Sequence, residues 1–193
     1  VGTFHSFCAN VLRKDGEYIG LNTFTIYDDE DQLKLLKQAM ENSDIDPRRF
    51  SRRAVQSAIS KAKSLLLDAH AYSLKAESYF EQTVGGIYES YQTLLERNKA
   101  VDFDDLLFLA VQLFKVFPET LGNYQDRFVH ILIDEFQDTN IAQYELANML
   151  AGVHRNICVV GDPDQSIYSW RNADLRNIIS FQSNYPDAKV INL

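Results

Sequence analysis

The sequence contains little cysteine, proline, glycine or tryptophan. Its 193 residues include 2 cysteines, 4 prolines, 8 glycines and 1 tryptophan. Cys8 and Cys158 lie in unrelated contexts without metal-ligand spacing, which argues against a disulfide scaffold or a cysteine metal site and favours a reducing compartment. We expect both cysteines to be small buried residues of the core.

Long hydrophobic runs are also absent. No apolar stretch approaches the roughly 18 to 20 residues that a membrane-spanning helix needs, and no signal-peptide pattern opens the sequence. A cytoplasmic protein without a membrane partner is therefore expected. The chain starts at Val1 rather than at a methionine, and we expect it to be part of a longer protein.

Positive charge is scarce, since 19 lysines and arginines face 27 aspartates and glutamates and the formal net charge is −8. Any nucleic-acid contact must therefore use a local basic patch. Such a patch is predicted between Asp46 and Asp68, where no acidic residue occurs. Its basic residues are Arg48, Arg49, Arg52, Arg53, Lys61 and Lys63. Arg49 and Arg53 are the candidates for duplex-phosphate contacts, and a solvated helix face remains the alternative.

Residues 9–100 are predicted to be mostly helical. The acidic run after Asp28 suits a helix N-terminus, and Ser51 is a plausible N-cap for a second helix. A third helix is expected after Gly85 and Gly86, which predict a break or kink. The apolar faces of these helices comprise Leu33, Leu36 and Met40; Val55, Ala58, Ile59, Ala62 and Leu66; and Ile87, Tyr91, Leu94 and Leu95.

From about residue 101 the pattern changes to helices alternating with short β-rich runs. The helices are expected over residues 101–117, 144–152 and 174–183, and the strands over residues 128–135, 156–161 and 188–193. The first of these strands contains the apolar run of residues 130–133, and we predict that it is buried on both faces. Strands that alternate with helices indicate an α/β fold with a parallel sheet, whose ligands bind at the carboxyl ends of the strands.

Two adjacent carboxylates, Asp134 and Glu135, follow the apolar run of residues 130–133. Carboxylates at the end of a buried strand need a counter-charge, and a magnesium nucleotide is one that such sheets hold. In phosphoryl-transfer ATPases a strand-end aspartate holds magnesium and a neighbouring carboxylate polarises the attacking water. A solvated acidic loop remains the alternative.

A second polar loop, "GDPDQSIYSW" at residues 161–170, contains Tyr168 and the only tryptophan, Trp170. In extended backbone, residues at i and i+2 face the same side, which suits a platform on which nucleic-acid bases stack. Rings that cap a domain edge or a helix are the ordinary alternative.

Four segments occur in order along the chain: "GTFHSFC", "VDFDDLL", "LIDEFQDTN" and "VVGDPDQSIYSWRNAD". Together they resemble the UvrD/Rep/PcrA-type DNA helicases of superfamily one. The resemblance implies Asp134 as the magnesium residue, Glu135 as the general base and Gln165 as the sensor of the γ-phosphate. It further implies a set of residues near the DNA. These are Thr3, His5, Phe103, Tyr168, Trp170 and Arg171.

The same resemblance implies a RecA-like P-loop NTPase sheet with an all-helical inserted subdomain. Residues 1–8 would end the first part of the motor domain, residues 9–100 would form the helical insertion, and residues 101–193 would form the second part of the motor. ATP and Mg²⁺ are the implied cofactors, and single-stranded DNA and its junction with duplex are the implied partners, with 3′ to 5′ polarity.

The sequence departs from the family pattern in three ways. Asn172 stands where glycine is usual, and Pro163 stands where alanine is frequent. No glycine is followed by lysine, so the phosphate-binding G-x-x-x-x-G-K-[ST] loop is absent. We therefore predict that this 193-residue chain alone has no appreciable ATPase or unwinding activity.

Three alternatives to a helicase or translocase motor remain open. One is the motor portion of a helicase-nuclease subunit. Another is a nucleic-acid-binding module with a degenerate ATPase, against which the intact Asp134, Glu135 and Gln165 argue. The last, an unrelated α/β hydrolase, lacks a G-x-S-x-G nucleophile or a recognisable Ser/His/Asp set.

Overall fold

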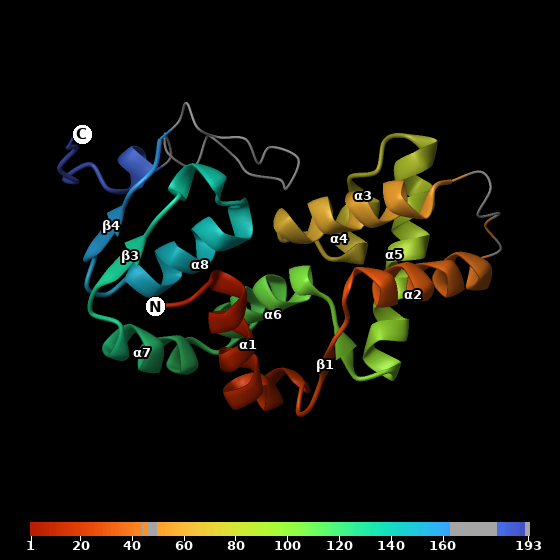
Figure 1. Ribbon diagram of the computed structural model, residues 1–193, viewed down its shortest axis with the longest axis horizontal. Coiled ribbons are helices and arrows are strands. Elements are labelled where there is room, and N and C mark those ends of the chain that lie inside the picture. Colours follow the sequence, from red (N-terminus) through yellow and green to blue (C-terminus); the bar gives the residue numbers. More distant parts are fainter. Residues whose placement is uncertain (44, 46–49, 163–180, 192–193) are drawn as a thin grey trace. The chain divides into compact units, whose positions relative to one another are not determined.

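The computed structural model describes residues 1–43, 45, 50–162 and 181–191. They are mostly helical, with two small parallel sheets, and form two compact units, Val1–Thr120 and Leu121–Leu193 (Figure 1). The elements of the first unit are α1 (Phe4–Asp15), η1 (Gly16–Ile19), β1 (Thr25–Ile26), α2 (Asp29–Asn42), α3 (Arg52–Ser64), α4 (Ala69–Leu74), α5 (Tyr79–Arg97), β2 (Ala100–Val101) and α6 (Phe103–Val116). α7 (Pro118–Arg127) leads into the second unit, whose other elements are β3 (Ile131–Ile133), η2 (Phe136–Asp138), α8 (Ile141–Ala151) and β4 (Ile157–Val159).

Helix α1 begins the first unit and packs against α6. Thr3 caps α1, because its hydroxyl accepts a hydrogen bond from the backbone N–H of Ser6 at 3.2 Å. The buried face of α1 contains Cys8, which is fully buried as predicted, and burial raises the pKa of this thiol to about 12. Cys8 is therefore an inert core residue at neutral pH.

The helical part of the first unit has its own core between α2, α3 and α5. As predicted, α2 follows Asp28 and α3 follows Ser51. The Asp28 carboxylate accepts from the backbone N–H of Asp31 at 3.0 Å, whereas the Ser51 side chain makes no capping hydrogen bond. The core residues are Leu35, Leu36, Ala39, Met40, Val55, Ile59, Ala62, Val84, Ile87, Tyr88, Tyr91, Leu94, Leu95 and Ala100.

The predicted break at Gly85 and Gly86 is wrong, because both glycines lie inside the continuous helix α5. Gly85 is buried against α4, where a Cβ atom would clash with the Ser73 hydroxyl. Gly85 is thus a packing glycine that lets two helices approach closely, rather than a helix breaker.

Strands β1 and β2 were not predicted, because each has two residues and no periodicity reveals so short a strand. They pair in parallel, with Thr25 opposite Ala100 and Ile26 opposite Val101. The pairing brings together the two ends of the segment that contains α2 to α5. Helix α6 lies within the helix predicted over residues 101–117, but Val101 belongs to β2 rather than to the helix.

The second unit contains a β3–α8–β4 connection with β3 and β4 parallel, which confirms the predicted alternation. The register pairs Ile131 with Ile157 and Ile133 with Val159. Helix α8 ends before Gly152 as predicted, whereas α7 was not predicted.

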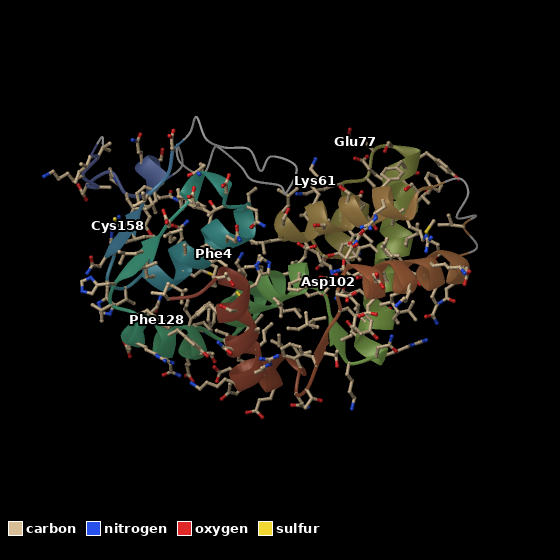
Figure 2. All side chains as sticks on the ribbon, viewed as in Figure 1. Phe4, Lys61, Glu77, Asp102, Phe128 and Cys158 are labelled. Atoms are coloured by element: carbon tan, nitrogen blue, oxygen red, sulfur yellow. The ribbon has the colours of Figure 1, made fainter. Side chains whose placement is uncertain are left out.

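Three predictions for the second unit are wrong. β3 is not buried on both faces, since Leu132 is 77% exposed, and Cys158 on β4 is exposed rather than buried (Figure 2). Within the described residues, no layer covers this face of the pair. Residues 188–191 form no strand, because the described part of the chain gives them no strand partner. Of the helix predicted over residues 174–183, only the end is described, and residues 181–184 are helical.

Among the residues that the structure describes, no helix is both long and apolar enough to span a membrane.

Candidate active site

The ends of β3 and β4 are joined by backbone hydrogen bonds that bring two distant segments together. The N–H of Val160 donates to the carbonyl of Ile133 at 2.8 Å, and the N–H of Phe136 donates to the carbonyl of Val160 at 2.9 Å. The segment after β4 therefore lies directly beside the segment after β3. This is the carboxyl edge at which parallel sheets bind ligands.

Asp134 and Glu135 occupy this edge, and both are exposed. Glu135 has left-handed backbone geometry, with φ 51° and ψ 41°, which turns the chain sharply after β3. Its backbone N–H donates to Asp134 Oδ1 at 3.0 Å. Left-handed geometry is unfavourable for a residue other than glycine and is often found at functional sites.

Phe136 anchors the acidic pair to the interior of the second unit. Its ring is 1% exposed and lies 5.9 Å from the ring of Tyr144 and 5.6 Å from that of Phe181. Two exposed carboxylates are thus followed immediately by a fixed aromatic side chain, which limits backbone motion at the site.

Gln137 connects the two segments through its side chain and was missed by sequence reasoning. Its Nε2 donates to Glu135 Oε2 at 2.7 Å, while its Oε1 accepts from the backbone N–H of Asp162 at 3.1 Å. Gln137 is only 1% exposed. A glutamine after two acidic residues carries no sequence signal for this role, because the contact depends on strand pairing.

The donors at this edge fit a hydrated magnesium ion. Mg²⁺ prefers carboxylate oxygens, retains several waters and shares its coordination with nucleotide phosphates. Asp134 supplies an exposed carboxylate at the strand end. Among the described residues, no cluster of three or more histidine, cysteine, aspartate or glutamate side chains could hold a metal alone. An exposed carboxylate at a strand end can share such an ion with waters and phosphates.

Several predicted site residues lie outside the described residues. They are Gln165, Tyr168, Trp170, Arg171 and Arg49, together with the two departures from the family pattern, Pro163 and Asn172.

The structure brings together two of the residues predicted near DNA, His5 and Phe103, at the starts of α1 and α6. Their ring centroids are 6.0 Å apart, with an interplanar angle of 74°. Phe103, the first residue of α6, is 48% exposed. Thr3 is also exposed while it caps α1.

A buried ion cluster contains Asp102 and Asp105, which flank Phe103 in the sequence. Lys63 of α3 is 1% exposed, and its Nζ lies 2.6 Å from Asp102 Oδ2 and 2.7 Å from Asp105 Oδ1 (Figure 2 labels Asp102). The two carboxylates also form the capping box of α6, because each accepts from the backbone N–H of the other at 2.8 and 3.1 Å. Lys63 thus joins α3 to the start of α6.

The prediction that Lys63 belongs to the basic patch is therefore wrong, because its ammonium is buried and paired with Asp102 and Asp105. Burial alone would lower the pKa of Lys63, but the combined charges of Asp102 and Asp105 raise it. The hydroxyl of Tyr91 completes the cluster by donating to Asp102 Oδ2 at 3.1 Å.

A third carboxylate, that of Asp104, forms no salt bridge with a described lysine or arginine. Burial, and then the negative charge of Asp102, raise the pKa of Asp104 to about 7, although the Ser60 hydroxyl and Lys63 act in the opposite direction. The start of α6 therefore contains more negative than positive charge in a poorly hydrated place.

Arg53 is exposed, as predicted, but its guanidinium already has a partner. Its NH1 lies 2.8 and 2.7 Å from the two carboxylate oxygens of Asp29, and Gln56 donates to the same carboxylate at 2.9 Å. Contact with phosphate would require Arg53 to share or leave this ion pair. Its role in binding DNA remains a prediction.

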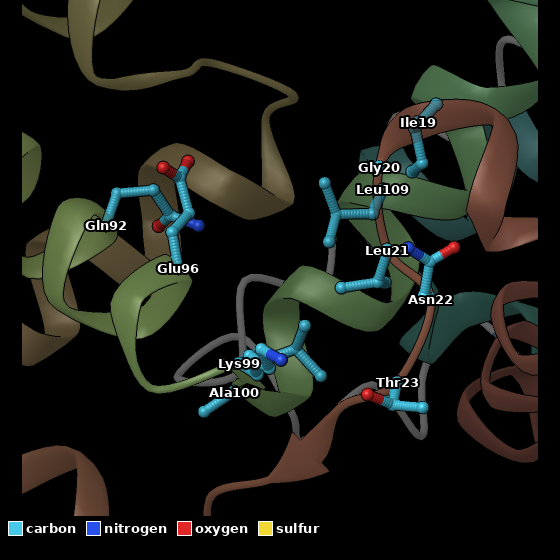
Figure 3. A pocket seen from close by; sticks show the side chains of 11 residues that line it. Ile19, Gly20, Leu21, Asn22, Thr23, Gln92, Glu96, Lys99, Ala100 and Leu109 are labelled. Carbon is cyan, nitrogen blue, oxygen red and sulfur yellow. The ribbon is translucent and has the colours of Figure 1, made fainter.

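The first unit also has a pocket of about 500 Å³, lined by residues 19–23, the end of α5, β2 and α6 (Figure 3). Gln92 and Glu96 line one side of it, and Leu109 contributes an apolar wall. Of the predicted site residues that the structure describes, none lines this pocket.

Comparison with known proteins identifies the family. The model of the UvrD/REP helicase N-terminal domain matches residues 1–186. The chain is 46% identical over 192 residues to an ATP-dependent DNA helicase PcrA of Staphylococcus epidermidis, covering 99% of this chain and 26% of that protein. It is 45% identical over 192 residues to the PcrA helicases of Bacillus subtilis and Staphylococcus aureus, with the same coverage. The chain thus spans about a quarter of the length of these relatives, and it belongs to the UvrD/REP helicase N-terminal domain family.

Proposed function

We propose that the full-length protein is an ATP-dependent DNA helicase or translocase that tracks along single-stranded DNA from 3′ to 5′ and acts at junctions with duplex. The observation that carries the proposal is the acidic pair at the end of β3, held beside the segment after β4. The relatives named ATP-dependent DNA helicase PcrA support the same activity. In this proposal the second unit belongs to a RecA-like motor, and residues 9–100 contain the helical insertion.

Asp134 and Glu135 divide the nucleotide chemistry between them. Asp134 would hold Mg²⁺ through water, and the bound ion supplies positive charge to the phosphates. Glu135 accepts a proton from the water that attacks the γ-phosphate, and Gln165 contacts that phosphate. The left-handed backbone of Glu135 supports this division, because the chain turns there and both carboxylates stay at the end of the same strand.

Phe103, Tyr168 and Trp170 form the stacking surface for bases in this proposal, with Thr3, His5 and Arg171 beside the backbone of the strand. The exposed ring of Phe103 supports the assignment, since an apolar ring in water gains free energy when a base covers it. Arg49 and Arg53 would contact duplex phosphates.

The proposal is tested by Glu135→Gln in the full-length protein. This change keeps the shape of the side chain and removes its ability to accept a proton. DNA-stimulated ATP hydrolysis should fall by about 100-fold or more, while binding of a fluorescent ATP analogue is retained. Glu89→Gln, at an exposed position of α5, is the matched control and should leave hydrolysis unchanged. Hydrolysis at the unsubstituted rate in Glu135→Gln would refute the assignment.

A further inference from the structure

We infer that Gln137 is a positioning residue that orients the carboxylate of Glu135 for proton transfer and ties it to the segment after β4. The inference rests on the proposed function, because it concerns the base of that reaction. It is carried by two hydrogen bonds of the buried Gln137 amide. Its Nε2 donates to Glu135 Oε2 at 2.7 Å, and its Oε1 accepts from the Asp162 N–H at 3.1 Å.

The orientation of the Gln137 amide follows from its partners. A backbone N–H can only donate, so the amide atom that faces Asp162 must be the oxygen. The amide nitrogen then faces Oε2 of Glu135. An ionised carboxylate has no donor and can only accept a hydrogen bond, so the nitrogen is its suitable partner. Both ends of the side chain are satisfied by this single arrangement, and the reverse arrangement would leave two unfavourable contacts.

The backbone near Gly161 keeps Gln137 in place. A Cβ atom at position 161 would lie 2.7 Å from Gln137 Oε1, 3.2 Å from its backbone nitrogen and 3.3 Å from that of Phe136. A side chain at this position would therefore displace the amide. Because Gln137 is 1% exposed, it has no alternative position in solvent.

This arrangement has a chemical consequence for Glu135. An exposed glutamate samples several rotamers, and few of them direct an oxygen at one particular water. The bond to Oε2 restricts the carboxylate to a narrow range and thereby orients Oε1, the oxygen left to accept the proton. Proton transfer requires a heavy-atom separation of about 2.6 to 3.2 Å, so this restriction acts on kcat rather than on nucleotide affinity.

Two substitutions of Gln137 in the full-length protein separate positioning from folding. Gln137→Ala should lower kcat for ATP hydrolysis by about 10- to 100-fold with KM changed less than about threefold. Gln137→Glu keeps the acceptor for the Asp162 N–H but removes the amide that donates to Glu135 Oε2. It should therefore lower kcat as Gln137→Ala does, again with little change in KM.

Gln125→Ala is the matched control. Gln125 donates a hydrogen bond of the same length, 2.7 Å, to the Met149 carbonyl in the same unit, but it does not contact Glu135. Its removal should leave kcat and KM unchanged. A third variant, Gly161→Ala, reaches Gln137 from the other side and should also lower kcat with little effect on KM.

The outcomes distinguish this inference from the proposed function. If Glu135→Gln abolishes hydrolysis while Gln137→Ala retains at least half of the unsubstituted kcat, the inference is overturned and the proposed function stands. A kcat of Gln137→Glu that stays within about twofold of the unsubstituted value, or equal losses in Gln125→Ala and Gln137→Ala, would also overturn the inference. If the unsubstituted full-length protein hydrolyses no ATP, both are overturned.

Discussion

Asp104→Asn should remove much of the pH dependence of stability at the start of α6. Asp104 lies beside Asp102 and Asp105, and in the described part of the chain Lys63 supplies the one ammonium near the three carboxylates. Burial, followed by the charge of Asp102, raises the pKa of Asp104 to about 7. In the unfolded chain an aspartate has a pKa of about 3.9.

The direction of the pH effect follows from the linkage between proton binding and folding. Because the folded pKa of Asp104 lies above the unfolded value, its contribution to stability is complete below a pH of about 4 and is lost as pH rises through about 7. Each pH unit in this window costs at most about 1.4 kcal/mol, so raising the pH from 5.5 to 8 should destabilise this region by about 2 kcal/mol. In Asp104→Asn this loss should shrink to the smaller contribution of Asp105, whose pKa burial also raises.

Hydrogen exchange measured on α6 peptides is the suitable assay, because it reports the free energy of local opening. The intrinsic pH dependence of exchange is removed with an unstructured peptide of the same sequence. Asp126→Asn, at an exposed position of α7, is the control and should keep the unsubstituted slope. An Asp104→Asn protein whose protection falls with pH as steeply as that of the unsubstituted protein would refute the reasoning.

Two further predictions follow from the packing and exposure of single residues. Gly85→Ala should lower the free energy of unfolding by about 1 to 3 kcal/mol, because its methyl group would meet Ser73. Gly86→Ala should raise it by about 0.5 to 1 kcal/mol, because its methyl group would meet no neighbouring atom within 4 Å. Equal shifts of the two variants in differential scanning calorimetry would contradict this reading. Phe103→Ala should weaken binding of oligo-dT to the full-length protein by about 1 to 3 kcal/mol in fluorescence anisotropy, while Tyr18→Ala, at another exposed aromatic residue, should not.

Sequence periodicity predicted α2 and α3 well because the patterns that cause them are local. The acidic run after Asp28 and the apolar stripe of Val55 and Ile59 act within one helix, and both helices begin where expected. The β3–α8–β4 alternation was also readable, since each element carries its own pattern. What a residue does within its own helix or strand was therefore predictable.

The errors share the opposite cause, a partner distant in sequence. Lys63 reads as one of several surface cations, and only the approach of Asp102 and Asp105 from 39 or more positions along the chain turns it into a core residue. Gly85 reads as a helix breaker because its packing against Ser73 lies outside any local window. The short strands β1 and β2 depend in the same way on each other.

The candidate site shows where sequence motifs stop being informative. Asp134 and Glu135 could be singled out because carboxylates at the end of a buried strand need a counter-charge and because they stand in a family motif. Gln137 could not, because its role depends on the register of β3 and β4. That register places Val160 between the carbonyl of Ile133 and the N–H of Phe136. A slip by one residue would turn each strand's side chains to the opposite face and remove the Asp162 N–H from Gln137. Strand pairing and the geometry of the proposed catalytic site are therefore one requirement at this edge, and under the proposed function a substitution that loosens the pairing should reduce kcat before it unfolds the protein.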